Sequence, residues 1–518
     1  MKETSDLHDL IHSLSMSEKR YISLSIMHQG DKAYLKLFRT IAKLKTFDEE
    51  ELRSQLKGEK FIDRLPKIKY FLYNFILKKL SGYYWSRNTD TQLHELFIET
   101  DILFKKNLIL QATKRMQKLK ELAEENDEYE LLLQCYRWER RFSINSSYRL
   151  KTIKDREALL DKEMELIKNM GILGNYYALS DKLYIFIKSK GDIRKESDEK
   201  ELRKFLDNPI LKDNPAGLPG PARIIHHHLH MHVYYYLHNY KGALEHTEKY
   251  LAVLKPKIFS NEAILKRYVN GMNNKALLQV SLKDYPAAFT TLEKMREVVR
   301  SVSAKTHFSE EITKSLQAGL YELQMELYLG SGQYKKGLEM IPVIEEFMEK
   351  YEGKLEPEYV LIFNYIMAYF NFIFGNYKPC IQYLNRILNY TKQDLILRED
   401  IYCYSKIVYL IAHYEAGTEG LPEYLIKSTY RFLAQRQRLY KVENTILTFI
   451  RNKLLKSYNP NRLTHSLEEL KENIIKISKD PYERKILDYF DFTSWLESKI
   501  SRRPFLEVMT EAHSKQAK

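Results

Sequence analysis

The residues best suited to chemistry lie in the stretch IIHHHLHMHVYYYLHNY, residues 224–240, which carries five histidines within seven positions. Imidazole nitrogens bind metal ions, and two histidines four residues apart share one face of a helix. This spacing joins His226 to His230 and His228 to His232. A stable metal site needs a third or fourth ligand, and no HExxH, CxxC or carboxylate cluster lies nearby in the sequence. The run is therefore better explained as a polar surface that binds a partner, with a metal site as an alternative.

The sequence lacks the motifs of the common catalytic sites. Gly332 and Gly337 have the spacing of a phosphate-binding loop, but Leu338 and Glu339 stand where that loop needs lysine and serine or threonine. No GxSxG nucleophile elbow, dinucleotide-binding glycine turn or protein-kinase motif set occurs. We therefore expect a protein that is not an enzyme and that carries no cofactor.

The candidate residues must be positioned by helices. Of 518 residues only 18 are glycine and 14 are proline, whereas leucine, lysine, glutamate and tyrosine are abundant. Such a composition favours long helices over hairpin turns. The chain is also longer than a single compact core usually reaches, which favours an array of helices or several domains. The predicted fold class is all-α.

Composition also limits which cellular compartment and which partners can be expected. The three cysteines form no CxxC pair, so neither a disulfide framework nor a cysteine zinc site is indicated. The first thirty residues show no signal-peptide pattern, and no run of eighteen apolar residues follows. The net charge of +14 allows an acidic partner, but lysine and glutamate are interleaved along most helices, as on solvated faces. We expect a cytoplasmic protein with no membrane partner.

Residues 1–90 are predicted to form a small helical domain. Ser15 and Glu18 have the spacing of a capping box, so a helix should begin there. Further helices are expected in KAYLKLFRTIAKL, after the acidic residues 48–51, and in LPKIKYFLYNFILKKLSGYYW. If the domain were helix-turn-helix-like, the residues that could contact nucleic acid would be Arg64, Lys67, Lys69, Lys78 and Lys79.

Nucleic-acid binding by this domain is an alternative to the preferred interpretation. Helix-turn-helix units joined to repeat arrays occur among bacterial regulators, and the repeats would then sense a ligand. The domain is only mildly basic, however, and phosphate contacts are not obviously clustered in its sequence. The lysines can equally form the solvated side of a helix whose core residues are Phe71, Leu72, Phe75, Ile76 and Leu80.

Residues 91–213 are predicted to form irregular helical hairpins. Short connections between long helices favour antiparallel neighbours. The stretch NPAGLPGPA, residues 214–222, contains three prolines and two glycines, so we expect a loop or a hinge without helix. The amphipathic segments before it span residues 92–106, 108–125, 128–145, 152–170 and 173–189.

Four similar junctions follow this break, namely HNYKGA (238–243), KDYPAA (283–288), GQYKKG (332–337) and GNYKPC (375–380). Each has a turn residue, then Asn, Asp or Gln, then tyrosine, two variable positions and a small residue. The tyrosines recur at intervals of 45, 49 and 43 residues. The pattern resembles the helix-to-helix junction of the tetratricopeptide repeat, although these units are longer than its 34-residue consensus. The small residues are Ala243, Ala288, Gly337 and Cys380.

This resemblance implies a right-handed superhelical array of antiparallel helix pairs over residues 222–440, with a concave groove. Residues 441–504 would cap the array, with ILDYFDFTSWLESKI as the capping helix, and residues 505–518 would form a polar tail. The implied function is a scaffold or adaptor that binds a protein or peptide in the groove. The groove residues would be His228, His232, Tyr235, Tyr236, Tyr365, Tyr369 and Phe372.

Overall fold

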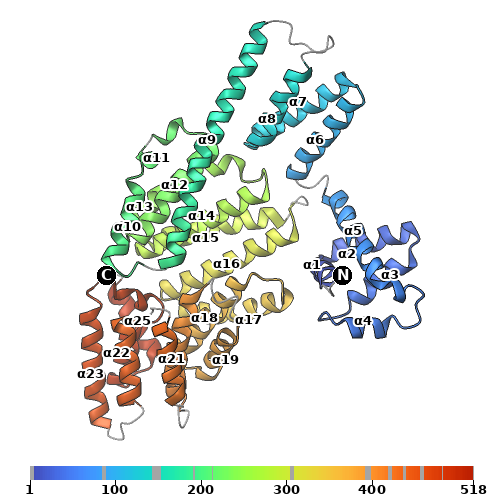
Figure 1. The fold of residues 1–518 in the computed structure, drawn as a ribbon. Coiled ribbons are helices and arrows are strands. Elements are labelled where there is room, and N and C mark those ends of the chain that lie inside the picture. Colours follow the sequence, from blue (N-terminus) through green and yellow to red (C-terminus); the bar gives the residue numbers. More distant parts are fainter. Residues whose placement is uncertain are drawn as a thin grey trace. The chain divides into compact units, whose positions relative to one another are not determined.

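The computed structural model describes residues 5–84, 89–142, 153–190, 193–212, 214–303, 308–390, 398–417, 423–435, 439–454, 460–480 and 482–516. Within these ranges the chain forms helices and no strand, and helices that follow one another along the chain pack together (Figure 1). The predicted all-α class is confirmed for this part of the chain. None of the described helices is both long enough and apolar enough to cross a membrane.

The first helices begin where side chains cap their free amide groups. Ser15 Oγ accepts from the Glu18 amide at 3.3 Å, and the Ser15 amide donates to Glu18 Oε2 at 2.7 Å, which completes the predicted capping box. Asp31 and Asp48 cap the next two helices through their carboxylates. The elements are α1 (Asp6–Ser13), α2 (Met16–Gln29), α3 (Lys32–Ile41), α4 (Glu49–Gln55), η1 (Ile62–Arg64) and α5 (Leu65–Tyr84).

A single helix, α9, replaces the two helices predicted at 152–170 and 173–189. Gly171 and Gly174 lie inside it, yet a glycine costs only about 1 kcal/mol relative to alanine in a helix interior. Burial of side chains such as Tyr176 beyond the glycines outweighs that cost. The predicted break was therefore wrong. The helices of this region are α6 (Thr89–Lys105), α7 (Ile109–Glu125), α8 (Tyr129–Phe142) and α9 (Ile153–Lys190).

The proline-rich stretch at 214–222 is a loop only in part. Residues Pro215–Gly217 form a 3-10 turn, and a helix begins at Gly220 with Pro221 in its first turn. Proline is tolerated there because the first amides of a helix have no intrahelical acceptor. The expectation that no helix enters this stretch was wrong. The elements are α10 (Glu196–Leu206), α11 (Pro209–Lys212), η2 (Pro215–Gly217), α12 (Gly220–Tyr236), α13 (Tyr240–Leu254) and η3 (Lys255–Lys257).

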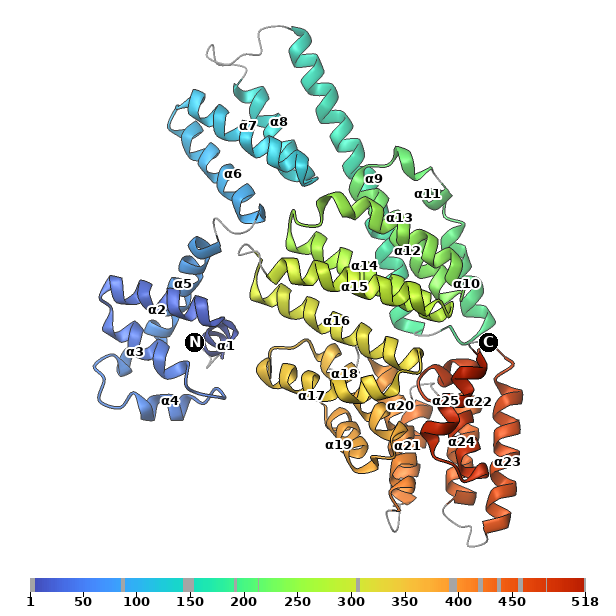
Figure 2. The ribbon, with the colours of Figure 1, turned by 180° about the vertical axis from the view of Figure 1, so that it is seen from behind.

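The four predicted junctions share one backbone geometry. In each, the tyrosine is the first residue of the second helix, and the residue two positions earlier is left-handed. These residues are His238, Lys283, Gly332 and Gly375, with φ angles of 55°, 62°, 73° and 74°. The junctions follow α12, α14, α16 and α18 (Figure 2). The remaining elements here are α14 (Glu262–Ser281), α15 (Tyr285–Ser303), α16 (Glu310–Gly330), α17 (Tyr334–Lys350), α18 (Pro357–Ile373) and α19 (Tyr377–Leu388).

A hydrogen bond closes each of these turns, because the residue after the left-handed one donates its amide to the carbonyl five positions earlier. This bond satisfies a carbonyl that the end of the helix leaves without an intrahelical donor, as in a Schellman motif. The four bonds run from Asn239 to Tyr234 at 2.9 Å, Asp284 to Gln279 at 2.8 Å, Gln333 to Tyr328 at 2.9 Å and Asn376 to Asn371 at 2.8 Å.

The same geometry occurs at two junctions that the sequence pattern did not reveal. Asn107, before α7, and Asp127, before α8, have left-handed φ angles of 60° and 57°. The pattern missed them because Ile109 takes the tyrosine position in the first, and Leu132 takes the small position in the second. The closing hydrogen bonds run from the Leu108 amide to the Leu103 carbonyl and from the Glu128 amide to the Ala123 carbonyl, both at 2.9 Å.

The small residue of each predicted junction allows two helices to approach closely. Ala243, Ala288 and Cys380 are fully buried, and a Cβ atom built on Gly337 would overlap the ring of Phe370. Phe370 is itself fully buried, so its ring has little room to move aside. Packing between α17 and α18 therefore requires the small side chain.

We expect Gly337→Ala to lower the free energy of unfolding by about 1–3 kcal/mol, although alanine is the better helix former. The added methyl group must displace the Phe370 ring inside a packed core. Gly174→Ala is the matched control, because Gly174 is also helical and nothing lies within 4 Å of the added atom. The control should be stabilising by up to about 1 kcal/mol. Urea unfolding followed by circular dichroism measures both variants, and equal changes would contradict this packing explanation.

The expected capping helix in ILDYFDFTSWLESKI is divided in the structure. A 3-10 segment ends at Asp488, and a new helix starts after Asp491, whose Oδ1 accepts from the Ser494 amide at 2.9 Å. Because Asp491 caps the first turn of this new helix, the helix begins there and does not continue from the preceding residues. The C-terminal elements are α20 (Glu399–Glu415), α21 (Glu423–Gln435), α22 (Lys441–Phe449), the π-helical η5 (Ile450–Leu454), α23 (Pro460–Ile477), η6 (Arg484–Asp488), α24 (Phe492–Ser501) and α25 (Phe505–Gln516).

The stretch predicted as a polar tail, residues 505–518, is helical over its described part, α25. Phe505, Val508 and Met509 are buried on one side of this helix. These three side chains stand at i, i+3 and i+4, the spacing of one helix face, but the face is buried only because a partner surface exists in the folded chain.

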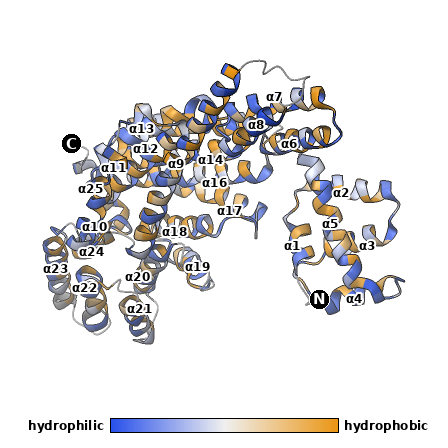
Figure 3. Cartoon of the chain, turned by 45° about the horizontal axis from the view of Figure 1, so that its top comes forward, coloured by the Kyte–Doolittle hydropathy of each residue, from blue (hydrophilic) through white to orange (hydrophobic). Residues whose placement is uncertain are grey.

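The helices fall into two compact units. The first comprises Met1–Met170, Lys257–Leu265 and Val302–Thr313, and the second comprises Gly171–Pro256, Lys266–Ser301 and Lys314–Lys518. Apolar and polar residues alternate along the helices, as expected where each helix buries one face (Figure 3). These units are defined by contacts in space, whereas the domain boundaries in the sequence analysis were drawn from sequence patterns. Those boundaries therefore remain predictions.

Candidate functional site

Helices α12 and α13 bring six histidines together within the second unit. Five come from α12, and the sixth, His246, comes from the facing helix α13. They form two groups. The first contains His226, His227 and His230 with His246, and the second contains His228 and His232.

The first group is a stack of imidazole rings in which His226, His227 and His230 are buried and His246 is half-buried. The rings of His230 and His246 stack with centroids 4.3 Å apart and 8° between their planes. His227 Nδ1 lies 3.3 Å from His246 Nδ1, so one of the two nitrogens carries the shared proton. His230 Nδ1 donates to the His226 carbonyl at 3.0 Å, which leaves its Nε2 without a proton in the neutral ring.

Tyr176 on α9 fixes the orientation of His226. The Tyr176 hydroxyl donates to the Ile210 carbonyl at 2.8 Å, and the same oxygen lies 3.1 Å from His226 Nδ1. Because the hydroxyl proton is already used, His226 Nδ1 is the donor in the second contact. This chain of hydrogen bonds holds three helices in register around the ring.

The second group is a pair of half-buried histidines. His228 Nε2 and His232 Nε2 are 3.0 Å apart, and the His228 ring lies against Tyr250 with centroids 5.7 Å apart. One nitrogen must donate and the other accept, so at least one ring of the pair is neutral.

Burial keeps the histidines neutral at physiological pH. Desolvation, followed by repulsion from neighbouring histidines and Lys249, lowers the pKa of His226 to about 4. Desolvation is also the largest cause for the others. It lowers the pKa of His227 to about 4, of His228 to about 3, of His232 to about 4 and of His246 to about 3.

The candidate metal ligands of α12 lie together in pairs rather than in larger sets. His226 and His230 fall in one group and His228 and His232 in the other, as their spacing predicts. In the part of the chain that the structure describes, no set of three or more His, Cys, Asp or Glu side chains could hold a metal ion. Each pair would need ligands from solvent or from a second molecule, and the metal site stays a prediction.

The surface end of α12 carries the other predicted partner residues. The Tyr235 side chain is 39% exposed and its ring lies against Tyr236, with centroids 5.4 Å apart. Tyr236 is half-buried, as are His228 and His232. These four side chains therefore remain at least partly accessible on one helix.

The remaining three predicted groove residues lie in the core. Tyr365, Tyr369 and Phe372 are 8%, 7% and 0% exposed. The Tyr365 hydroxyl donates to the Tyr489 carbonyl at 3.0 Å, and the Asp491 amide donates to the Tyr369 hydroxyl at 2.9 Å. The expectation of a free groove surface was wrong at these positions, because the C-terminal segment, residues 482–516, covers them. The aromatic contacts of Phe372 are with Phe490 and Phe505 of that segment and with Tyr377.

The predicted nucleic-acid contacts do not share one environment. Lys69 Nζ donates to Glu49 Oε2 at 2.8 Å and lies over the Phe47 ring, so its charge is already paired. Arg64, Lys67 and Lys78 are exposed, and Lys79 is half-buried with Nζ 5.5 Å from the centroid of the Phe75 ring.

Helix α5, which carries these lysines, is buried along part of its length only. Leu72 and Ile76 are fully buried, as predicted. Phe75 and Leu80 are half-buried, and Phe71, also predicted in the core, is 45% exposed. Nucleic-acid binding stays a prediction that rests on the exposed cations alone.

Comparisons with protein families and with curated proteins gave no match from which the function of this site could be inferred. No protein-family model matches the chain, and no curated protein matches it. The functional argument therefore depends on the geometry and chemistry of the described residues.

Proposed function

We propose that the chain is a non-catalytic helical-repeat adaptor that binds a protein or peptide. Its paired helices would form a tetratricopeptide-like, right-handed superhelix of antiparallel hairpins. The observation that supports the fold proposal is that one junction geometry occurs six times between Asn107 and Gly375. The same hydrogen bond closes the turn each time. A chain that repeats one turn between helices stacks similar units, and stacked units present a long surface to partners.

The proposed interface is the accessible side of α12, formed by His228, His232, Tyr235 and Tyr236. Tyrosine supplies a large ring and a hydroxyl at low conformational cost, which is why interfaces favour it. The Nε2 atoms of His228 and His232 share a hydrogen bond, so each ring offers a partner its Nδ1, which accepts in the ring whose Nε2 donates and donates in the other neutral ring. The buried aromatic residues of α18 are excluded from this interface because they bind the C-terminal segment.

Site-specific photocross-linking tests the interface. A benzoyl-phenylalanine residue in place of Tyr235 should yield a discrete cross-linked protein in cells of the native host, identified by mass spectrometry. The matched control replaces Tyr424, which is 67% exposed on α21 and lies outside the interface. The same adducts at both positions, or none at Tyr235, would count against the proposal.

A second measurement asks whether the cross-linked protein is a true partner. The purified partner should bind the intact chain, and Tyr235→Ala with His232→Ala should weaken binding at least tenfold. Tyr424→Ala should leave the affinity unchanged. The regulator and metal-binding alternatives remain predictions, since neither gains a supporting contact beyond those described above.

A further inference from the structure

Helix α9 exposes apolar residues in addition to those that it buries. Leu166 and Phe186 are among its buried residues and pack in the hydrophobic cores. The exposed ones recur at alternating intervals of four and three positions between Leu160 and Ala178, along a helix that is unbroken in Figure 1. Residues at these intervals lie on one side of a helix, and we call them the α9 stripe. The α9 stripe consists of Ile153, Leu160, Met164, Ile167, Gly171, Gly174, Ala178 and Ile185.

The large side chains of the α9 stripe are exposed to solvent. A helix that only covers a core needs one apolar face and usually carries polar residues on the other. Contiguous exposed apolar residues mark a surface that binds another molecule. The exposed fractions are 78% for Ile153, 45% for Leu160, 64% for Met164, 42% for Ile167 and 65% for Ile185.

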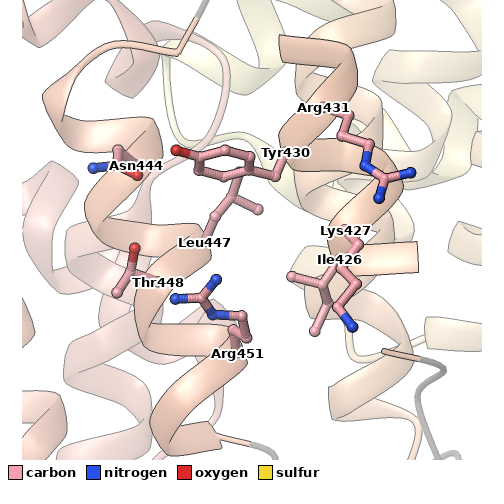
Figure 4. A pocket seen from close by; sticks show the side chains of 8 residues that line it. All are labelled: Ile426, Lys427, Tyr430, Arg431, Asn444, Leu447, Thr448 and Arg451. Atoms are coloured by element: carbon pink, nitrogen blue, oxygen red, sulfur yellow. The ribbon is translucent and has the colours of Figure 1, made fainter. Parts of the chain in front are cut away.

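The hollow between α21 and α22 offers little exposed aliphatic surface by comparison. Its aliphatic lining residues, Ile426 and Leu447, are buried, and its polar lining residues are exposed. Figure 4 shows Arg431 pointing away from the hollow. The α9 stripe is therefore the stronger indication of a binding surface.

Two glycines lie at the centre of the α9 stripe. Glycine destabilises a helix interior relative to alanine. No other part of the described chain lies within 4 Å of a Cβ atom built on Gly171 or Gly174, so packing inside the protein does not require either glycine. A second helix whose backbone approaches closely at this point would require both.

The spacing of the α9 stripe is that of the seam of a two-stranded coiled coil. The seam is complementary to itself when two copies of α9 run antiparallel, with Gly171 of one copy opposite Gly174 of the other. A large side chain then faces a small one where Ile167 meets Ala178, and opposite charges face each other at both ends of the seam. The facing pairs, each of which occurs twice, are Gly171–Gly174, Ile167–Ala178, Met164–Asp181, Leu160–Ile185 and Glu157–Lys188.

Other alignments of two α9 helices bring like charges together. A parallel pair in register places Glu157, Asp181 and Lys188 each opposite its own copy. An antiparallel pair shifted by seven residues places Glu157 opposite Asp181. Like charges that face each other in a seam repel, so these alignments are less favourable than the glycine-centred one.

We propose that the α9 stripe is a homodimer interface, at which two copies of this chain pair their α9 helices antiparallel around Gly171 and Gly174. A two-fold interface requires a surface that is complementary to itself, and the facing pairs meet this requirement. The inference depends on the continuity of α9 and not on partner binding by α12.

Sedimentation velocity of the full chain over a range of concentrations tests the proposal. We expect an equilibrium between monomer and dimer. Met164→Glu should weaken the dimer about tenfold or more, because the seam would bury a carboxylate without a partner. Leu110→Glu is the matched control, since Leu110 on α7 is also 64% exposed and lies outside the stripe. A monomer at all concentrations, or equal effects of the two variants, would overturn the proposal.

Disulfide formation between two single-cysteine additions tests the antiparallel alignment. Ile167→Cys mixed with Ala178→Cys should form a mixed disulfide under mild oxidation, because these positions face each other in the glycine-centred pair. Neither variant alone should do so, since each position lies 11 residues, about 16 Å, from its own copy. The three native cysteines are buried and do not compete. Disulfides within each variant alone, and none in the mixture, would show a parallel pair and overturn the proposed alignment.

Discussion

Replacement of Arg194 by methionine is expected to lower the free energy of unfolding by about 3–5 kcal/mol. The Arg194 side chain is 2% exposed and the Glu443 side chain is 1% exposed, and Arg194 Nη1 lies 2.9 Å from Glu443 Oε1. Removal of one member of a buried ion pair leaves the other charged group without water and without a partner. This is costlier than the loss of an exposed pair.

The contacts of Arg194 explain why the effect should reach across the second unit. Its Nε donates to the Tyr482 carbonyl at 2.6 Å, its Nη2 lies 3.5 Å from Glu483 Oε2, and its guanidinium carbon lies 3.7 Å from the Tyr440 ring centroid. Glu483 Oε2 also accepts from the Lys441 amide at 3.0 Å, at the start of α22. One guanidinium therefore joins the chain before α10 to α22 and to the C-terminal segment.

Urea unfolding of matched variants measures this effect. Arg203→Met is the control, because Arg203 also pairs with a glutamate, Glu199, at 2.7 Å but has a side chain that is 58% exposed. The control should cost no more than about 1 kcal/mol. Burial raises the pKa of Glu443 even beside Arg194, so Glu443→Gln in the Arg194→Met background should recover part of the loss. Equal losses for Arg194→Met and Arg203→Met would refute the buried-pair explanation.

Acidification from pH 7.5 to pH 5 is expected to destabilise the α12 and α13 hairpin strongly. The folded-state pKa values of His226 and His227 are about 4, below the ordinary value of 6.5. The unfolded state therefore binds protons first as the pH falls, and stability decreases from about pH 6.5 down to about pH 4. Above pH 6.5 this contribution is fully present. Each such histidine contributes a loss of about 2 kcal/mol at pH 5, since one unit of pKa corresponds to about 1.4 kcal/mol.

The charged surroundings make protonation of these rings still less favourable. Lys249 and Arg223 repel a proton on His227, and Arg267 repels a proton on His228. Among the described residues, the groups that shift the pKa of His227 or His228 include no carboxylate that would offset the added charge. The first imidazolium formed in the stack also repels the next, so the rings will not titrate independently.

Hydrogen exchange measured by mass spectrometry tests this prediction locally. Peptides from α12 and α13 should lose protection at pH 5, after correction for intrinsic exchange rates, more than peptides from α18. His246→Phe keeps a ring stacked on His230 and removes one titrating group, so it should reduce the pH dependence. His465→Phe is the control, because the His465 side chain is 74% exposed on α23. An unchanged pH dependence in His246→Phe would argue against the histidine stack as the cause.

The sequence was sufficient where structure depends on neighbours in the chain. The capping box at Ser15 and the four tyrosine junctions were predictable, because a helix end is made by residues within about six positions of each other. The i,i+4 histidine pairs were predictable for the same reason. Asn107 and Asp127 form the same turn, but the search missed them because it required a tyrosine followed by a small residue.

The tertiary structure alone decided the features that join distant residues. The continuity of α9, the burial of Tyr365 and Tyr369, and the helix α25 all depend on packing partners elsewhere in the chain. His246 could not be assigned to the histidine stack from its spacing, because it reaches the stack from a second helix.

Contacts between charged residues far apart in the sequence could not be predicted from the sequence either. Arg194 donates to Glu443 across a separation of 249 residues in the sequence. Local hydrogen bonds and side-chain periodicity determine where helices begin and end. Which faces are buried, and which charges lose their water, depends on contacts that form only when the helices pack.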